Sequence, residues 1–83
     1  MEIENAILIS LNKERKNKAF MTHWDKKYTR PETKYAIIDE LIKDTLLTEK
    51  EIVTGLNSLE AQNKVGSKLA GSKQNLFYWW FLK

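Results

Sequence analysis

Two hydrophobic patterns follow one another in the second half of the chain, the first helical and the second typical of strands. Over residues 48–63, apolar side chains recur at spacings of three and four, which places them on one helix face at about 100° per residue. Thr48 and Glu51 have the spacing of a capping box, in which each side chain binds a free amide at the helix start. Gly55 borders the apolar stripe, and close packing of another backbone would explain a residue that weakens a helix by about 1 kcal/mol. Ile52, Leu56 and Leu59 form the stripe, and the polar Asn63 is the next residue on the same face.

Two strand-like runs separated by turn-forming residues follow this helix. Residues 71–75 are rich in glycine, serine and asparagine, and residues 76–82 form an unbroken aromatic and aliphatic run. We therefore expect a β-hairpin over residues 64–82. One face of its last strand carries Leu76, Tyr78, Trp80 and Leu82, and the other carries Phe77, Trp79 and Phe81. One face must cover the helices, and the other is either buried too or exposed as a binding surface.

The first half of the chain predicts two further helices. Residues 4–12 place apolar side chains on one stripe. A second helix is expected to start near Pro31, where Thr29 and Glu32 repeat the capping-box spacing, and to end near Asp44. The inner stripes are Ile3, Ile7, Leu8 and Leu11 in the first helix, and Tyr35, Ile38, Leu41, Ile42 and Thr45 in the second.

The segment between these two helices is ambiguous. Residues 13–18 are charged and compatible with an exposed extension of the first helix, because cations suit a helix C-terminus. Residues 19–24 fit either a short strand beside the hairpin or a continuation of that helix, and six residues are too few for periodicity to decide. Residues 25–30 are expected to form a loop.

Composition favours one small domain over residues 1–83 and argues against catalysis. The 83 residues contain no cysteine, and His23 is the single histidine, so a cysteine-based zinc finger is excluded and a histidine-built metal site is not expected. No nucleophile or glycine-rich phosphate loop accompanies His23. We expect no enzyme activity, cofactor, metal or small-molecule ligand. No apolar run approaches the roughly 20 residues of a membrane span, so we expect a cytoplasmic protein without a membrane partner.

Charge is strongly segregated along the chain. Residues 12–34 contain eight basic and three acidic residues, whereas residues 35–63 contain two basic and six acidic ones. Residues 64–83 contain four lysines and no acidic residue, so the predicted hairpin is basic. Such segregation steers charged partners to one part of a surface, although the lysines could also serve only to keep a small protein solvated.

The segment from about Pro31 to Lys83 resembles the winged helix-turn-helix family of bacterial, archaeal and phage regulators and replication initiators. The matching positions are Ile37, Ile38 and Leu41, then Leu47, Thr48, Glu49, Lys50, Glu51, Ile52, Leu56, Leu59 and Glu60, followed by the hairpin. The resemblance implies an α+β fold with three helices and a C-terminal β-hairpin wing. The family commonly has a glycine in the turn between its second and third helices, whereas residues 44–48 have none.

The resemblance further implies a DNA-binding function. The helix over residues 48–63 would lie in the major groove, and the wing over residues 66–75 would contact the backbone. On a helical wheel, the side opposite the apolar stripe carries short polar residues, one alanine and one lysine, which are types that contact bases and phosphates. The candidates are Lys50, Thr54, Asn57, Ser58 and Ala61 on the helix, with Lys64, Lys68, Ser72, Lys73 and Gln74 after it. We therefore expect a double-stranded DNA-binding protein, either a transcriptional regulator or a replication or phage accessory factor.

Other partners remain open. The acidic residues 35–63 and the aromatic last strand would also suit a winged-helix module for protein contact, such as an inhibitor or adaptor. In that case Phe77, Trp79 and Phe81 would form the interface, including a two-fold contact in a homodimer. A third alternative is RNA binding, because bases stack on exposed aromatic rings.

Overall fold

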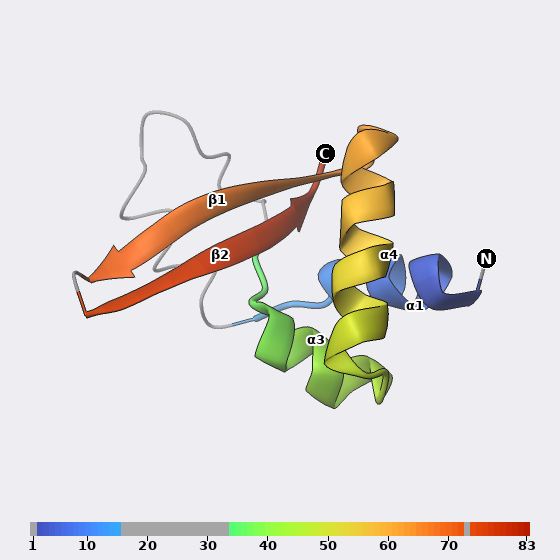
Figure 1. Ribbon diagram of the computed structural model, residues 1–83, viewed down its shortest axis with the longest axis horizontal. Coiled ribbons are helices and arrows are strands. Elements are labelled where there is room, and N and C mark those ends of the chain that lie inside the picture. Colours follow the sequence, from blue (N-terminus) through green and yellow to red (C-terminus); the bar gives the residue numbers. More distant parts are fainter. Residues whose placement is uncertain (1, 16–33, 73) are drawn as a thin grey trace.

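The computed structural model describes residues 2–15, 34–72 and 74–83, with the side chains of Ser72 and Asn75 excluded. Over these residues the chain is α+β, with three helices followed by a C-terminal antiparallel hairpin (Figure 1). The elements are α1 (Glu2–Leu11), α3 (Ile38–Thr45), α4 (Glu49–Ala61), β1 (Val65–Ser72) and β2 (Asn75–Leu82). The ambiguous residues 19–24, the expected loop 25–30 and Lys73 lie outside the described residues.

Helix α4 confirms the capped helix predicted from residue 48. The Glu51 amide donates to Thr48 Oγ1 at 3.2 Å, and the Thr48 amide donates to Glu51 Oε1 at 3.0 Å, which completes the capping box. At the other end, Asn63 has a φ of 61°, and the Lys64 amide donates to the Leu59 carbonyl at 3.0 Å. This left-handed residue closes the helix and turns the chain into the hairpin.

Helix α3 begins at Ile38, so the prediction of a helix from Pro31 was wrong over residues 34–37. Ala36 is extended, and it exchanges two backbone hydrogen bonds with Trp80 at 2.9 and 2.8 Å. This pairing with β2 stabilises an extended backbone where sequence alone favours a helix. The helix starts only after it, and the Ile37 amide donates to Glu40 Oε1 at 3.2 Å.

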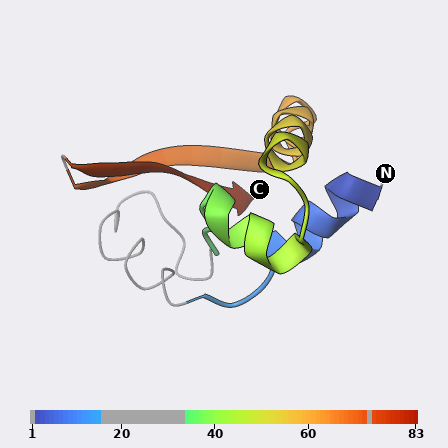
Figure 2. The same cartoon turned by 60° about the horizontal axis from the view of Figure 1, so that its bottom comes forward.

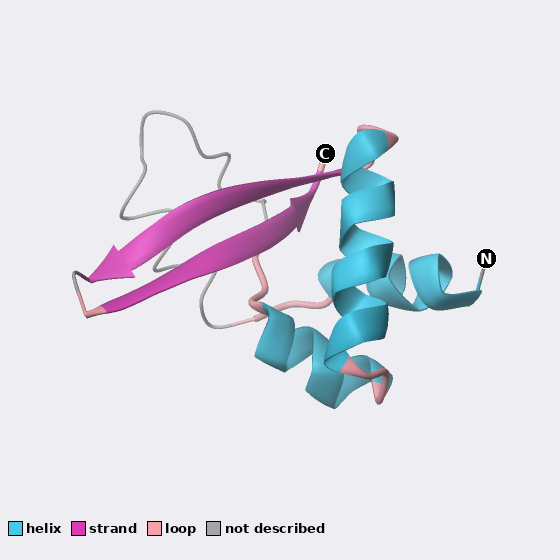
Figure 3. Cartoon of the chain, in the orientation of Figure 1, coloured by secondary structure: helices cyan, strands magenta, loops and turns pink. Residues whose placement is uncertain are grey.

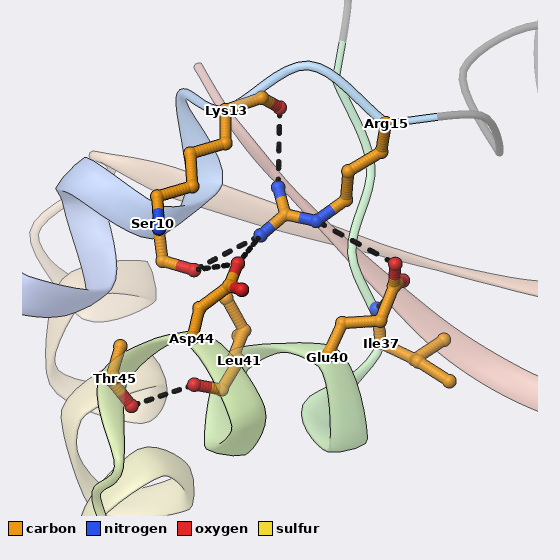
Figure 4. A network of polar contacts seen from close by, with 8 residues as sticks. All are labelled: Ser10, Lys13, Arg15, Ile37, Glu40, Leu41, Asp44 and Thr45. Atoms are coloured by element: carbon orange, nitrogen blue, oxygen red, sulfur yellow. Dashed lines mark hydrogen bonds and ion pairs between the residues drawn. The ribbon is translucent and has the colours of Figure 1, made fainter.

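Helix α1 ends at Leu11, so the possible helical extension is contradicted over residues 13–15. The Lys13 amide donates to the Ser10 carbonyl at 3.1 Å in a closing turn. Beyond that turn the side chain of Arg15 folds back onto α3 (Figure 4). Arg15 is thus engaged in a tertiary ion pair and not in a continued helix.

The hairpin reaches well beyond the three helices in both views of the chain (Figures 2 and 3). Its strands pair from Val65 with Leu82 at the base to Ser72 with Asn75 beside the turn. Ala36 lies against the other edge of β2, which makes β2 the central strand at the base of the hairpin. The base is therefore fixed to the helices, while the distal half projects.

The main core lies between the three helices and the base of the hairpin. Its buried members are Ile7, Leu11, Ala36, Leu41, Ile52, Leu56, Leu59, Val65 and Trp80. A second cluster lies on the other face of the hairpin, where Tyr35 and Ala70 pack with Trp79 and Phe81. The rings of Tyr35 and Phe81 have centroids 5.3 Å apart, and Trp79 Nε1 donates to the Ala70 carbonyl at 3.2 Å. Both faces of the hairpin base are thus covered by apolar packing.

Gly55 faces α1, but the close neighbours are side chains and not the backbone that we expected. A Cβ atom at Gly55 would lie 2.5 Å from Ile7 Cδ1 and 3.2 Å from Ile3 Cγ2. Glycine therefore lets two isoleucines of α1 approach α4 closely.

No described helix is both long enough and apolar enough to cross a membrane.

Candidate nucleic-acid interface

The outward face of α4 presents the short side chains expected from the helical wheel. Lys50, Thr54, Asn57 and Ala61 are exposed, and Ser58 is half-buried. The opposite side of the helix is fixed in the core through Ile52, Leu56 and Leu59. The orientation of α4 is therefore set by apolar packing, and its polar face is free to meet a partner.

One flank of this face borders a groove between α4 and the start of α1. The groove has a volume of about 320 Å³ and is lined by Ile3, Glu4, Lys50, Glu51, Thr54, Gly55 and Ser58. Gln62 Nε2 donates to Glu4 Oε2 and to Ser58 Oγ, each at 3.1 Å. This flank thus carries acidic side chains, so a phosphate backbone would approach α4 more favourably from the hairpin side.

Side-chain contacts fix the base of the hairpin relative to α4. Ser67 Oγ donates to Glu60 Oε2 at 3.1 Å, and Lys83 Nζ donates to Asn63 Oδ1 at 2.7 Å. Gly66 lies opposite Phe81, and a Cβ there would meet the Phe81 ring at 2.7 Å. The small residue lets the aromatic ring lie over the strand pair, which supports the angle at which the hairpin leaves the helix.

The structure places the predicted wing residues along this hairpin. Lys64 is exposed at the junction with α4, Lys68 is half-buried on β1, and Gln74 is exposed in the turn. Lys73 and the side chain of Ser72 lie outside the described parts. The described lysines therefore begin next to the C-terminal end of α4 and continue onto β1.

The aromatic triplet of the last strand is divided by its environment. Phe77 is 43% exposed, whereas Trp79 and Phe81 are half-buried against Tyr35 and Ala70. Of the three residues predicted to form an interface, Phe77 is the most exposed.

An exposed apolar surface on the distal hairpin was not predicted from the sequence. Trp80 and Leu82 cover the helices as one face of the strand was expected to do, but residues farther along the same face do not. Leu69, Leu76 and Tyr78 are 51%, 54% and 58% exposed. Pattern alone could not separate them from Trp80, because the hairpin continues past the edge of the helices.

Arg15 forms a buried polar network that sequence reasoning missed. Its side chain is only 7% exposed, and Nη2 donates to Asp44 Oδ2 at 2.6 Å and to Ser10 Oγ at 3.0 Å (Figure 4). Arg15 Nε also lies 3.6 Å from Glu40 Oε2. Partial burial raises the pKa of Asp44, but the Ser10 hydrogen bond and the charges of Lys13 and Arg15 outweigh it and lower that pKa overall. Two acidic residues of α3 are thus held beside a cation.

Within the described residues, no group of three or more histidine, aspartate or glutamate side chains is arranged to hold a metal ion. Comparison with protein-family models, with curated proteins and with solved structures returned no match to this chain.

Proposed function

We propose that this chain is a winged-helix protein that binds double-stranded DNA, with α4 in the major groove and the hairpin on the neighbouring backbone. The observation that carries the proposal is the junction at residues 62–64, where the exposed polar face of α4 passes directly into a lysine-bearing hairpin. The pairing of Ala36 with Trp80 adds a strand position between α1 and α3. Among the residues that the structure describes, the order of helix, short strand, two helices and hairpin is consistent with the winged-helix layout.

The outer face of α4 has suitable chemistry for reading base edges. An asparagine such as Asn57 can bind adenine through two hydrogen bonds, and a lysine such as Lys50 can bind guanine. Ala61 and the methyl group of Thr54 can contact a thymine methyl group. Each well-aligned bidentate contact discriminates against a wrong base by about 1–3 kcal/mol. Apart from Lys50 these side chains are short, so the helix axis can approach the floor of the groove.

The charge distribution favours an orientation in which the lysine-bearing hairpin contacts the DNA phosphates. Residues 64–83 hold four lysines and no acidic residue. Among the acidic residues of α3, Glu40 and Asp44 are beside Arg15, and on α4 Glu60 accepts a hydrogen bond from Ser67. Contacts between lysine and phosphate supply affinity without sequence preference, so binding should weaken steeply as salt rises.

A titration of labelled duplex DNA at several salt concentrations tests the proposal. We expect Lys64→Ala combined with Lys68→Ala to weaken binding to all sequences alike and to reduce the salt slope by about 2, since each phosphate contact contributes about 0.9. Lys43→Ala, which removes an exposed lysine from α3, is the matched control and should leave the slope unchanged. Absence of binding to any duplex at low salt would overturn the proposal.

A selection from random duplexes tests the placement of α4. Asn57→Ala should change which sequence is preferred, because the lost contact is to a base. Asn5→Ala alters an exposed asparagine of α1 and should leave the preferred sequence unchanged. If Asn57→Ala selects the same sequences as the parent protein, α4 does not read bases through this residue.

The groove between α1 and α4 supports a second candidate function, the binding of a protein segment. Ile3 and Gly55 contribute apolar surface to the lining of the groove, and Glu4 and Glu51 contribute carboxylates, which suits an apolar segment with basic residues. Glu4→Lys separates the two functions, because it should abolish the binding of a basic segment, whereas it replaces a negative charge beside α4 by a positive one and should strengthen duplex binding or leave it unchanged.

A further inference from the structure

The distal half of the hairpin exposes apolar side chains on both of its faces. Leu69, Leu76 and Tyr78 share one face, since Leu69 pairs with Tyr78 and Gly71 pairs with Leu76. Phe77, which pairs with Ala70, lies on the opposite face and is 43% exposed. A surface that docks flat against a partner requires only one apolar face. A ribbon that is apolar on both faces is suited to insertion between two layers.

The charges around these side chains identify the chemistry of the partner. Every charged residue in 64–83 is a lysine, so the hairpin itself contributes only positive charge to the surface that carries these apolar groups. A duplex has a matching arrangement, with an anionic phosphate exterior and stacked apolar bases inside.

The length of the hairpin also matches the spacing of DNA grooves. Leu76 and Phe77 lie about six residues from the base of the hairpin, which at ~3.3 Å per residue is roughly 20 Å. With α4 in a major groove, the neighbouring minor groove is about half a helical turn away, or roughly 17 Å. The hairpin leaves the C-terminal end of α4 sideways and not along the helix axis (Figure 1). The distal residues can therefore reach the next groove.

We infer that Leu76 and Phe77 form an apolar wedge that enters the minor groove, unstacks a base step and bends the duplex. This inference rests on the proposed function, since α4 must bind DNA for the hairpin to reach the neighbouring groove. Lys68, on the same strand pair, binds a phosphate nearer the kink, Lys64 binds one beside α4, and Leu69 and Tyr78 contact the groove walls. Proteins that insert apolar wedges in this way bend DNA by about 20–90°.

The test measures bending and binding separately. A duplex of about 20 base pairs, roughly 70 Å long, carries a donor and an acceptor dye at its ends. We expect saturating parent protein to increase energy transfer between the dyes. The double variant Leu76→Ser with Phe77→Ser should bind the duplex with an affinity within about threefold of that of the parent protein. At saturation it should leave energy transfer at the value of the free duplex. Ile9→Ser, which replaces an exposed isoleucine of α1, is the matched control and should bend DNA as the parent does.

A duplex with a central mismatch provides a second readout that a merely structural role would not alter. The parent protein should bind it roughly tenfold more tightly than the matched duplex, because a weakened step already carries part of the unstacking cost. The double variant should lose this preference. If the double variant does not fold, as judged by circular dichroism, Leu76→Ser alone should reduce both effects, since that side chain is 54% exposed.

The possible failures are distinguishable. Duplex binding without bending and without mismatch preference overturns the wedge and leaves the proposed function intact, whereas absence of any duplex binding overturns both. If the free parent protein forms a dimer and the double variant does not, these side chains contact a second copy of the chain. The four exposed apolar side chains would be assigned to a membrane surface if the parent protein sediments with anionic vesicles, the double variant does not, and both proteins bend DNA equally. Either result overturns the wedge.

Discussion

Arg15 and Asp44 are joined by a hydrogen-bonded ion pair in which Nη2 lies 2.6 Å from Oδ2 across 29 positions of sequence. The pair connects the segment after α1 to the last turn of α3, and Ser10 donates to the same carboxylate oxygen at 3.0 Å. Because the guanidinium is almost fully buried, its partners are needed to offset its desolvation. The network therefore sets how α1 and α3 lie relative to each other beneath α4.

Arg15→Ala should destabilise the protein by about 1–3 kcal/mol, because it leaves the Ser10 hydroxyl and two carboxylates without their common donor. Arg15→Lys should recover only part of this loss, since a lysine keeps the charge but cannot contact Asp44, Glu40 and Ser10 through one planar fork. Urea unfolding monitored by circular dichroism measures both variants. A loss for Arg15→Ala no larger than that for Lys43→Ala would show that the network contributes nothing to stability.

The network should make stability depend on pH in the acidic range. The pKa of Asp44 is lower in the folded chain than its ordinary value of 3.8, so the unfolded chain binds a proton first as pH falls. The stabilisation is therefore complete above about pH 5, declines as pH falls past the unfolded value, and is lost once pH falls through the folded pKa. In urea unfolding from neutral to acidic pH, Asp44→Asn should flatten this part of the curve and Asp39→Asn should not. Equal curves for Asp44→Asn and the parent protein would contradict the assignment.

Leu46 has a strained backbone that a glycine would relieve. Its φ is 61°, its amide donates to the Ile42 carbonyl at 2.8 Å, and its side chain is 88% exposed. A left-handed conformation costs a residue with a Cβ roughly 1 kcal/mol, and little packing is lost with the exposed leucine. Leu46→Gly should therefore raise the free energy of unfolding by about 0.5–1 kcal/mol. Leu46→Ala, which keeps the Cβ, should give no such gain, and equal effects of the two variants would exclude backbone strain as the cause.

Gly55→Ala should destabilise the protein although alanine is the better helix former. The added Cβ would lie 2.5 Å from Ile7 Cδ1 in the buried contact between α1 and α4, and overpacking of this kind costs about 1–3 kcal/mol. The gain in helix propensity of about 1 kcal/mol offsets only part of that cost, so we expect a net loss near 1 kcal/mol. Ile7→Val removes the Cδ1 atom, and in a double-mutant cycle it should rescue Gly55→Ala. Additive effects of the two substitutions would show that the contact is not limiting.

Local chemistry made α4 and the hairpin predictable from the sequence. Thr48 and Glu51 define the start of α4 through contacts within one turn. The turn-forming residues 71–75 correctly predicted a hairpin, although the strands extend farther than expected, to Ser72 and from Asn75. The start of α3 was not predictable in this way, because the extended backbone of Ala36 depends on Trp80 in a distant part of the chain. The Arg15 network has the same origin, since it joins residues that only the folded helices bring together.

For the candidate interface, the direction of each side chain was predictable from the sequence, but its burial along β2 was not. Helical periodicity correctly gave the exposed positions of α4, including Lys50 and Asn57, because the direction of a side chain on a helix follows from its position. Alternation along β2 correctly assigned residues to faces, but it could not show where the helices stop covering the strand. Trp80 and Tyr78 lie on the same face, yet one is 8% and the other 58% exposed. That difference depends on the size of the helical body relative to the length of the hairpin.

The bridge between Ala36 and Trp80 attaches the base of the hairpin to the buried backbone at the start of α3. Ala36 is fully buried at the entrance to α3, so these two backbone hydrogen bonds connect β2 directly to that helix, in addition to the contacts between the hairpin base and α4. The amide protons of Ala36 and Trp80 should consequently exchange with solvent together and as slowly as those of the core helices, whereas the strand amides near the turn should exchange sooner.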